Sequence, residues 1–256
     1  MICAMTDLTG HVALITGGNS GIGLGMARGL ADAGADIAIW GTNPAKNEAA
    51  VEQLQAVGRQ VHAEICDVSD EVAVERSFAA TVEALGRVDS VFANAGTSGF
   101  APNIWELSTE EWRRVLGVNL DGVFFTVRAA ARHMVERGGG GSIVLTGSTS
   151  TIHGAPNQPH YASSKTALLG LTRALAVGLA RHGVRVNALS PGWTVTELTA
   201  TGLQNEKFVE ATTRRTPVRR WGQPEDFAAV AVYLADPTQT FHTGDTLVVD
   251  GGYTVF

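Results

Sequence analysis

Cysteine, lysine and long apolar runs are scarce in this sequence. Only two of its 256 residues are cysteine, Cys3 and Cys66, so a disulfide framework is not expected and a reducing, cytoplasmic location is favoured. No window reaches about 18 uninterrupted apolar residues, the length that a membrane-spanning helix needs. The first residues also lack the charged start and apolar stretch of a signal peptide.

Clusters of positive charge and of metal-ligating side chains are missing as well. The formal net charge is -6, and nucleic-acid phosphates require clustered lysine and arginine, so no nucleic-acid partner is expected. The densest basic stretch holds Arg214, Arg215, Arg219 and Arg220, which we expect to form a solvated face or a subunit contact. The seven histidines are scattered, without an HExxH motif, so no catalytic metal is expected.

Short apolar runs alternate with segments of helical periodicity along the chain. The pattern predicts strands over residues 12–16, 36–40, 60–65, 88–93, 142–146, 185–189 and 246–249. It predicts helices over 22–33, 71–85, 108–136, 159–181 and 224–234, one more after the N-cap Asn43, and a capping box at 108–111. Apolar strands separated by helices are typical of a parallel sheet covered on both faces. The predicted fold class is α/β, a doubly wound Rossmann-like fold.

No linker, composition shift or internal repeat divides the chain, which predicts a single domain over residues 1–256. Within it, residues 1–8 are expected to form a loose N-terminus. Residues from about 193 to 215 are expected to form a substrate loop that acts as a lid over the site.

A glycine-rich loop, Thr16-Gly17-Gly18-Asn19-Ser20-Gly21-Ile22-Gly23, follows the first predicted strand. Its glycines allow the backbone to approach a pyrophosphate, and the next helix presents free N–H groups to it. The spacing is G-x-x-x-G-x-G rather than the commoner G-x-G-x-x-G, and a tight turn without a ligand would look similar. Its position favours dinucleotide binding by Gly17, Asn19, Ser20, Gly21, Ile22 and Gly23.

The segment after the second predicted strand normally distinguishes NAD from NADP. An acidic residue there pairs with the ribose 2′-hydroxyl of NAD, whereas an arginine accommodates the 2′-phosphate of NADP. Here Gly41, Thr42 and Asn43 supply neither, and the loop position for an arginine holds Ser20. The expected cofactor is NAD or NADP, with a slight preference for NAD because no cation is placed for the phosphate; Lys46 argues the other way.

Tyr161 and Lys165 stand four residues apart on a predicted helix, so both side chains project from one face. A free phenol has a pKa of about 10, too high for ready proton exchange at neutral pH. A nearby ammonium and a nicotinamide cation would favour the phenolate and lower that pKa. The pair predicts an acid/base at Tyr161, and an exposed pair on a helix surface is the alternative.

Ser148 follows the fifth predicted strand, in the chain just ahead of Tyr161. Ligands bind α/β sheets at the carboxyl ends of the strands, where a hydroxyl can hydrogen-bond a substrate carbonyl oxygen. Thr149 and Ser150 could donate the same bond, so spacing alone does not select Ser148.

At this point the residues resemble the classical short-chain dehydrogenase/reductase family, from Leu8 to Tyr253. The glycine loop is similar to the family's T-G-x-x-x-G-x-G, and Tyr161 and Lys165 match its Y-x-x-x-K. The other motifs that match, in the family's order, are Asn94-Ala95-Gly96, Asn119, Ser148 and Pro191-Gly192. Several motifs in the right order make the resemblance specific.

The resemblance implies an enzyme that transfers a hydride between NAD(P) and a carbonyl or secondary alcohol. Tyr161 would be the general acid/base, Lys165 would bind the nicotinamide ribose and Ser148 would orient the carbonyl. Asn119 would hold a water that links Lys165 to solvent. The candidate cofactor contacts outside the glycine loop are then Thr42, Asn43, Asp67, Val68, Asn94, Gly96, Tyr161, Lys165, Pro191, Gly192, Thr194 and Thr196.

The family also implies seven strands in the order 3-2-1-4-5-6-7 and a homotetramer formed through the two long helices and the C-terminal region. The chain departs from the family pattern at Gly147, where a serine is frequent, and at Gly41, where the acid of an NAD site is absent. The loop 152–160 also differs. Its His153 and His160 either contact the substrate or are solvated.

The substrate alternatives are a 3-oxoacyl thioester and a sugar or polyol. An acyl-carrier-protein partner would favour a basic rim, for which Arg128, Arg132 and Arg173 are candidates. Trp193 and Phe208 form either an apolar wall of the substrate site or part of the core. A dinucleotide-binding regulator without turnover is the rival from another class, and the intact catalytic set argues against it.

Overall fold

The computed structural model describes residues 6–256. Residues 1–5, with Cys3 and most of the predicted loose N-terminus, lie outside the described part. Leu8 is 1% exposed and its amide donates a hydrogen bond to the carbonyl of Ala33 (2.8 Å). The chain is therefore packed against the core from Leu8 onward.

Seven parallel strands form one sheet in the order β3-β2-β1-β4-β5-β6-β7, which confirms the predicted fold class and strand order. The strands are β1 (Val12–Thr16), β2 (Asp36–Gly41), β3 (Val61–Ile65), β4 (Ser90–Ala93), β5 (Gly141–Thr146), β6 (Val184–Pro191) and β7 (Thr246–Val249). All residues of β1, β4 and β6 are buried, because helices cover both faces of a parallel sheet.

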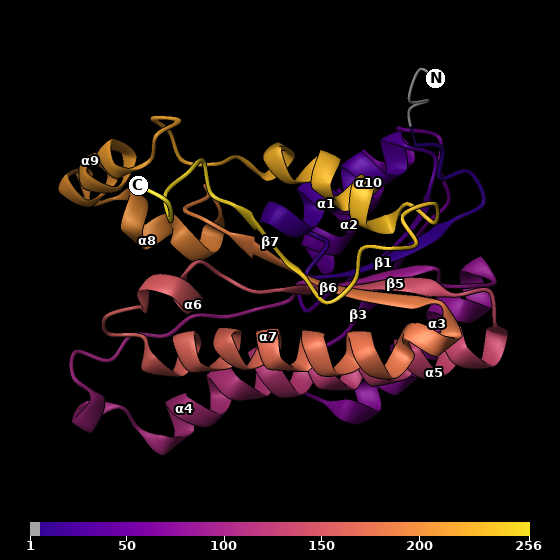
Figure 1. The fold of residues 1–256 in the computed structure, drawn as a ribbon, viewed down its shortest axis with the longest axis horizontal. Coiled ribbons are helices and arrows are strands. Elements are labelled where there is room, and N and C mark those ends of the chain that lie inside the picture. Colours follow the sequence, from indigo (N-terminus) through magenta and orange to yellow (C-terminus); the bar gives the residue numbers. More distant parts are fainter. Residues whose placement is uncertain (1–5) are drawn as a thin grey trace.

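The helices form one layer on each face of the sheet (Figure 1). On one face lie α1 (Gly21–Asp32), α2 (Pro44–Gln55) and α10 (Ala228–Ala235). On the other lie α3 (Glu71–Leu85), α5 (Gly122–Arg137) and α7 (Pro159–Leu179). Each layer closes its own apolar cluster against the sheet. Most candidate site residues lie on the segments that follow the strands at the carboxyl edge of the sheet.

The predicted long helix over 108–136 is interrupted. It consists of α4 (Thr109–Leu116), a π-helical turn over Gly117–Asp121, and α5. The side chain of Asn119 in this turn donates to the carbonyl of Thr97 (2.9 Å) and accepts from the amide of Thr97 (2.8 Å). Those two bonds to a separate loop hold the extra residue in the turn, and such bulges are frequent at functional sites.

The predicted capping box at the start of α4 is only half formed. The Ser108 hydroxyl accepts from the amide of Glu111 (3.1 Å). The Glu111 carboxylate accepts instead from the Arg114 guanidinium (2.7 Å), because a charged partner three residues away competes with the backbone amide of Ser108.

The predicted lid region contains helices that its polar sequence did not reveal. They are α8 (Ala200–Leu203) and α9 (Glu206–Arg215), and Asn205 caps α9 by accepting from the amide of Phe208 (3.2 Å). Trp193 stacks on Trp221 with ring centroids 5.3 Å apart, and Phe208 meets Trp193 edge-on at 4.9 Å. This aromatic cluster anchors α9 to the loop after β6, so Trp193 and Phe208 pack with each other and with Trp221.

Replacing Gly25 by alanine is expected to lower the free energy of unfolding by about 1–3 kcal/mol. An added Cβ would lie 2.0 Å from the carbonyl oxygen of Pro224, so α1 would have to move. Gly170→Ala in α7 is the matched control, because within residues 6–256 no atom lies within 4 Å of its added Cβ. Alanine should stabilise that helix by about 0.5–1 kcal/mol. Urea unfolding measures both variants, and equal losses of stability would contradict this packing account.

Candidate active site

The glycine loop joins β1 to α1 at the carboxyl edge of the sheet. Gly17 has a φ of 64°, and its amide donates to the carbonyl of Trp40 (2.7 Å). An added Cβ on Gly23 would lie 2.1 Å from the carbonyl oxygen of Gly17. Ser20 is the N-cap of α1 but makes no side-chain capping bond within the described residues. The first amides of α1 are therefore available to an anion such as a pyrophosphate, which fits a dinucleotide.

Asn94 ties this loop to the centre of the sheet. Its amide N–H donates to the Thr16 hydroxyl (2.9 Å), and its side chain donates to the carbonyl of Thr16 (3.1 Å). An added Cβ on Gly96 would lie 3.4 Å from both the Lys165 ammonium and the Asn119 side chain. Glycine at 96 thus leaves space between the glycine loop and the buried lysine.

Two asparagines fill the space beside Gly41 at the end of β2. An added Cβ there would lie 2.1 Å from Nδ2 of Asn19 and 2.6 Å from Oδ1 of Asn47. Asn19 donates to Asn47 (2.7 Å). The Cβ of an acidic side chain at position 41 would clash with both asparagines. The next residues, Thr42 and Asn43, are exposed, and Asn43 caps α2 as predicted.

Asp67 and Val68 follow β3 at the same edge of the sheet. Asp67 is exposed, and its carboxylate accepts from the amide (2.9 Å) and hydroxyl (2.7 Å) of Ser69. Val68 is buried in the core beside Gly122, whose added Cβ would lie 2.7 Å from it. A contact of Val68 with adenine would therefore come from its backbone.

Ser148, Tyr161 and Lys165 come together where β5 ends and α7 begins. Lys165 is 3% exposed, and its ammonium donates to the carbonyl of Thr146 (2.8 Å) and lies 5.9 Å from the centre of the Tyr161 ring. The Ser148 hydroxyl accepts from the amide of Ser150 (3.1 Å) and faces the phenol closely enough to lower its pKa. The spacing left Ser148 and its two neighbours open; in the fold, Ser148 faces Tyr161.

Burial governs the protonation of this group of residues. It lowers the pKa of Lys165 to about 8 and raises the pKa of Tyr161, against the smaller, lowering effect of Ser148. The sequence predicted that a nearby ammonium and a bound nicotinamide cation together lower the tyrosine pKa, and that stays a prediction. Desolvation of the phenol dominates, and Lys165 directs its hydrogen bond to the backbone of β5.

Asn119 lies next to this group and is fully buried. Besides its two bonds to Thr97, its amide donates to the Ser164 hydroxyl (3.2 Å), and Ser164 donates to the carbonyl of Tyr161 (2.7 Å). Its side chain thus connects the π-helical turn to the first turns of α7.

The segment after β6 faces the glycine loop from the other side. The amide of Gly192 donates to the carbonyl of Val249 (2.9 Å), in continuation of the β6–β7 pairing at Pro191. Thr194 is buried and its carbonyl accepts from the Thr199 hydroxyl (2.7 Å). An added Cβ on Gly21 would lie 3.1 Å from the side chain of Thr196.

An ion pair also joins the segment after β6 to α2. Lys46, at the start of α2, pairs with Glu197, which directly follows Thr196. The contact joins residues 151 positions apart in the sequence. The approach of Thr196 to Gly21 and this ion pair therefore place residues 194–199 opposite the glycine loop and the start of α2.

The two loop histidines lie in different surroundings. His160 is fully buried, with its Nε2 3.5 Å from the Glu111 carboxylate, so it is not solvated. His153 is exposed on α6 (Ser150–His153) and contacts Arg215. The sequence did not predict the network of Glu111, Arg114 and His160, because only the fold brings α4 next to the residue before Tyr161.

Within residues 6–256, no group of three or more histidine, cysteine, aspartate or glutamate side chains is arranged to hold a metal ion. Nor does any described helix combine the length and apolarity needed to cross a membrane.

Comparison with known proteins gives consistent matches along the chain. A family model described as enoyl-(acyl carrier protein) reductase matches residues 17–254. Gluconate 5-dehydrogenase of Gluconobacter oxydans is 37% identical over 249 residues, covering 97% of this chain and 96% of that protein. The 3-oxoacyl-[acyl-carrier-protein] reductase of Chlamydia pneumoniae is 33% identical over 248 residues, covering 96% of this chain and 98% of that protein.

A solved structure is also similar over nearly the whole chain. It is a gluconate 5-dehydrogenase from Burkholderia cenocepacia in complex with NADP and tartrate, with a TM-score of 0.92 and 36% identity. The match covers 98% of this chain and 97% of that one.

The free energy of unfolding should rise with pH between about 8 and 10.5 through Lys165. Its pKa falls from 10.5 to about 8 on folding, so in this window the unfolded chain binds more protons than the folded one. Lys165→Met should lose this rise, which approaches about 1.4 kcal/mol per pH unit. Urea unfolding at pH 7.5 to 9.5 measures it. Lys207→Met, at an exposed position, is the control, and a parallel slope in wild type and Lys165→Met would refute the assignment.

Proposed function

Because the chain belongs to the classical short-chain dehydrogenase/reductase family and is an NAD(P)-dependent oxidoreductase, we propose that its substrate is a sugar, polyol or sugar acid with a secondary alcohol or ketone. We propose Asn119, Ser148, Tyr161 and Lys165 as its catalytic residues. The observation that carries this is that Ser148 faces Tyr161 next to the buried Lys165. The nearby glycine loop leads into α1, whose first amides are available to a ligand.

The proposed roles follow from the protonation of the site. When bound, the nicotinamide exchanges a hydride with the substrate carbon. The raised pKa keeps the Tyr161 phenol protonated at neutral pH, so in reduction it donates its proton to the substrate oxygen, and in oxidation the proton returns to it. Ser148 hydrogen-bonds the same oxygen. Lys165, with a pKa of about 8, supplies or accepts protons near neutrality, and Asn119 keeps this part of α7 in place.

The polar surroundings of the site support a hydroxylated substrate. Thr97, which follows the Asn94-Ala95-Gly96 motif, is half-buried, and its hydroxyl accepts from Arg114 (2.9 Å). Gluconate 5-dehydrogenases are among the similar proteins. Two of the three arginines expected to form a rim for an acyl-carrier protein are engaged, because Arg128 pairs with Glu71 and Arg132 with Glu75 (3.2 Å), while Arg173 is exposed. These observations favour the sugar class over the acyl thioester.

The proposed cofactor residues lie on the glycine loop, on the segments that face it and next to Tyr161. They are Gly17, Asn19, Ser20, Gly21, Ile22, Gly23, Thr42, Asn43, Asp67, Val68, Asn94, Gly96, Tyr161, Lys165, Pro191, Gly192, Thr194 and Thr196. We propose that the enzyme accepts both NAD and NADP, with NAD modestly preferred. Position 41 offers no acid to repel the 2′-phosphate, while Lys46, the nearest cation to it in sequence, is engaged by Glu197.

We further propose a single domain with residues 193–215 as the substrate lid. A homotetramer is supported by apolar side chains left exposed on the long helices, Phe124 on α5 (44%) and Val177 on α7 (83%), since such positions become buried when helices of two subunits pack. Cytoplasmic location is supported by Cys66, which is buried and forms no disulfide within residues 6–256.

Tyr161→Phe should lower kcat by about 10²–10⁴-fold, because the variant cannot transfer the proton. Its affinity for NADH and NADPH, measured by fluorescence titration, should stay near that of wild type. Tyr233→Phe is the control, since Tyr233 lies on α10 and is 38% exposed. Rates come from nicotinamide absorbance with gluconate, glucitol and an acetoacetyl thioester. A rate within tenfold of wild type would sink the assignment of Tyr161.

Glu197→Gln should release Lys46 and strengthen NADP use, with a fall of about fivefold in the KM for NADP, the scale of an exposed ion pair. Lys46→Met should raise that KM by a similar factor. Neither change should move the KM for NAD more than twofold. Equal shifts in the KM for NAD and for NADP would mean that the Lys46–Glu197 ion pair affects cofactor binding without distinguishing the 2′-phosphate.

A further inference from the structure

Arg215, at the end of α9, meets two side chains from distant parts of the chain. Its guanidinium lies 4.4 Å from the ring centre of Tyr253, and its Nη2 lies 3.4 Å and 3.5 Å from the two ring nitrogens of His153. His153 also meets Tyr253 edge-on, with ring centroids 5.7 Å apart. We call His153, Arg215 and Tyr253 the Arg215 cluster.

The Arg215 cluster carries positive charge without a carboxylate to balance it. No described acidic side chain lies within ion-pair distance of Arg215, in contrast to Arg114, Arg128 and Arg220. Arg215 is half-buried, and its nearest polar neighbour, His153, is itself a cation when protonated. A guanidinium held by an aromatic ring and lacking a counter-ion is a ready partner for an anionic ligand.

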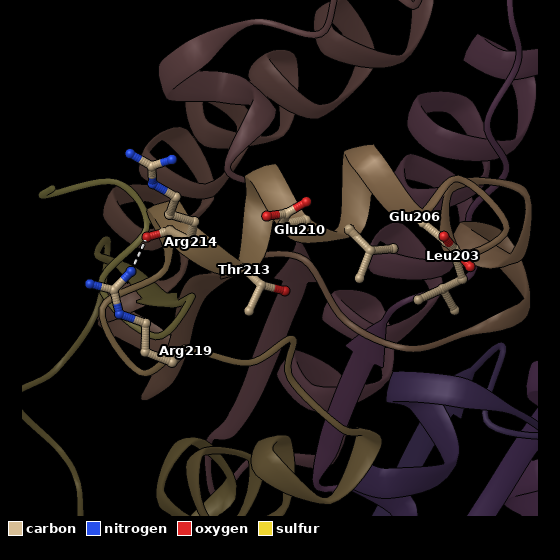
Figure 2. Close-up of a pocket in the computed structure, with 7 residues that line it drawn as sticks. Leu203, Glu206, Glu210, Thr213, Arg214 and Arg219 are labelled. Carbon is tan, nitrogen blue, oxygen red and sulfur yellow. Dashed lines mark hydrogen bonds between the residues drawn. The ribbon is translucent and has the colours of Figure 1, made fainter.

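The neighbouring charges of α9 point elsewhere. A groove of about 480 Å³ lies along α9. Its lining includes Glu206, Glu210 and Arg214 (Figure 2). Successive helical residues are turned by about 100° from one another. Arg215 is not part of that lining and contacts His153 and Tyr253 instead. The sequence expectation of a solvated face therefore suits Arg214 and does not suit Arg215.

The Arg215 cluster is connected to the catalytic serine by a short rigid link. The carbonyl of Ser148 accepts from the amide (3.1 Å) and the hydroxyl (2.8 Å) of Thr151. The amide of His153 in turn donates to the carbonyl of Thr149 (3.3 Å). The helix α6 begins at Ser150, two residues past Ser148, and ends at His153, a rise of about 4.5 Å from its first to its last residue. An anion on Arg215 would thus sit several carbon atoms away from the carbon that reacts beside Ser148.

The C-terminal side of the cluster is held in place as well. Both oxygens of the Asp250 carboxylate accept from backbone amides, those of Gly252 and Thr254 (2.8 Å each). These bonds fix the turn that carries Tyr253, so the ring under the guanidinium is preorganised and little order has to be gained on binding.

We propose that Arg215, assisted by His153, binds a carboxylate of the substrate and selects hydroxy and oxo acids whose carboxylate is several carbons from the reacting carbon, such as aldonic acids. The inference rests on the proposed function of the same site and adds its charge specificity. A planar guanidinium suits a carboxylate bidentately, and one permanent cation matches a single negative charge better than a phosphate monoester.

The test compares an acid with its neutral counterpart in the intact enzyme. With NAD(P), kcat/KM is measured for D-gluconate, D-glucitol and D-glucitol 6-phosphate in wild type, Arg215→Met and Arg215→Lys. Arg215→Met should lower kcat/KM for gluconate about 10–100-fold, mainly through KM, because a charge-assisted hydrogen bond is lost. Its kcat/KM for glucitol should change less than twofold. Arg215→Lys should recover part of the loss.

Arg181→Met is the control, because Arg181 is exposed between α7 and β6, outside the proposed lid, and it should change none of these values. Thermal unfolding and NADH titration show whether each variant is folded and still binds cofactor. If wild type turns over none of the three, isothermal titration of the NADH-bound enzyme with four- to six-carbon aldonates replaces the rates, with the same variants.

The outcomes separate the two proposals. Any one of four results would overturn the role of Arg215. Two concern Arg215→Met: equal losses of kcat/KM for acid and polyol, or no loss for the acid. Two concern wild type: a preference for the polyol or its phosphate, or no aldonate binding to the NADH-bound enzyme. Loss of NADH binding in wild type, or no dependence of any activity on Tyr161, would instead overturn the proposed function.

Discussion

The hydrogen bond from the Lys165 ammonium to the carbonyl of Thr146 holds the site together (2.8 Å). It joins α7 to the last residue of β5 from inside the protein, so Tyr161 on α7 and Ser148 just after β5 cannot separate without breaking it. Burial lowers the pKa of this ammonium to about 8. The same desolvation raises the pKa of the phenol. The positions of Lys165 and Tyr161 and the shifts of their pKa values therefore both result from the burial of these two side chains.

The glycine loop is held by contacts with other segments of the chain. Asn94, which follows β4, donates to Thr16 at the start of the loop, Thr196 lies against Gly21, and Lys46 pairs with Glu197. The aromatic cluster of Trp193, Phe208 and Trp221 holds α9 next to this closing segment. The stretch of chain after β6 therefore contacts both the glycine loop and α9.

Local patterns accounted for most of the architecture. Strand periodicity and the Asn43 cap of α2 were predicted because each depends on neighbouring residues, and the doubly wound sheet followed from the general handedness of parallel crossovers. The order of the strands was implied by the family resemblance. The π-helical turn at Asn119 was not, since it is held by bonds to Thr97. Helix α9 was missed because its sequence is polar and its stability comes from aromatic contacts outside it.

The sequence by itself determined the α/β class, the glycine loop and the pairing of a tyrosine with a lysine one helical turn later, because these are short-range features. Only the tertiary structure decided that Ser148 faces the phenol, that Asn19 and Asn47 fill the space beside Gly41, and that Arg215 lies on Tyr253 and His153. The last contact spans 62 residues of sequence. Such contacts depend on how separate elements pack, and no local spacing encodes that packing.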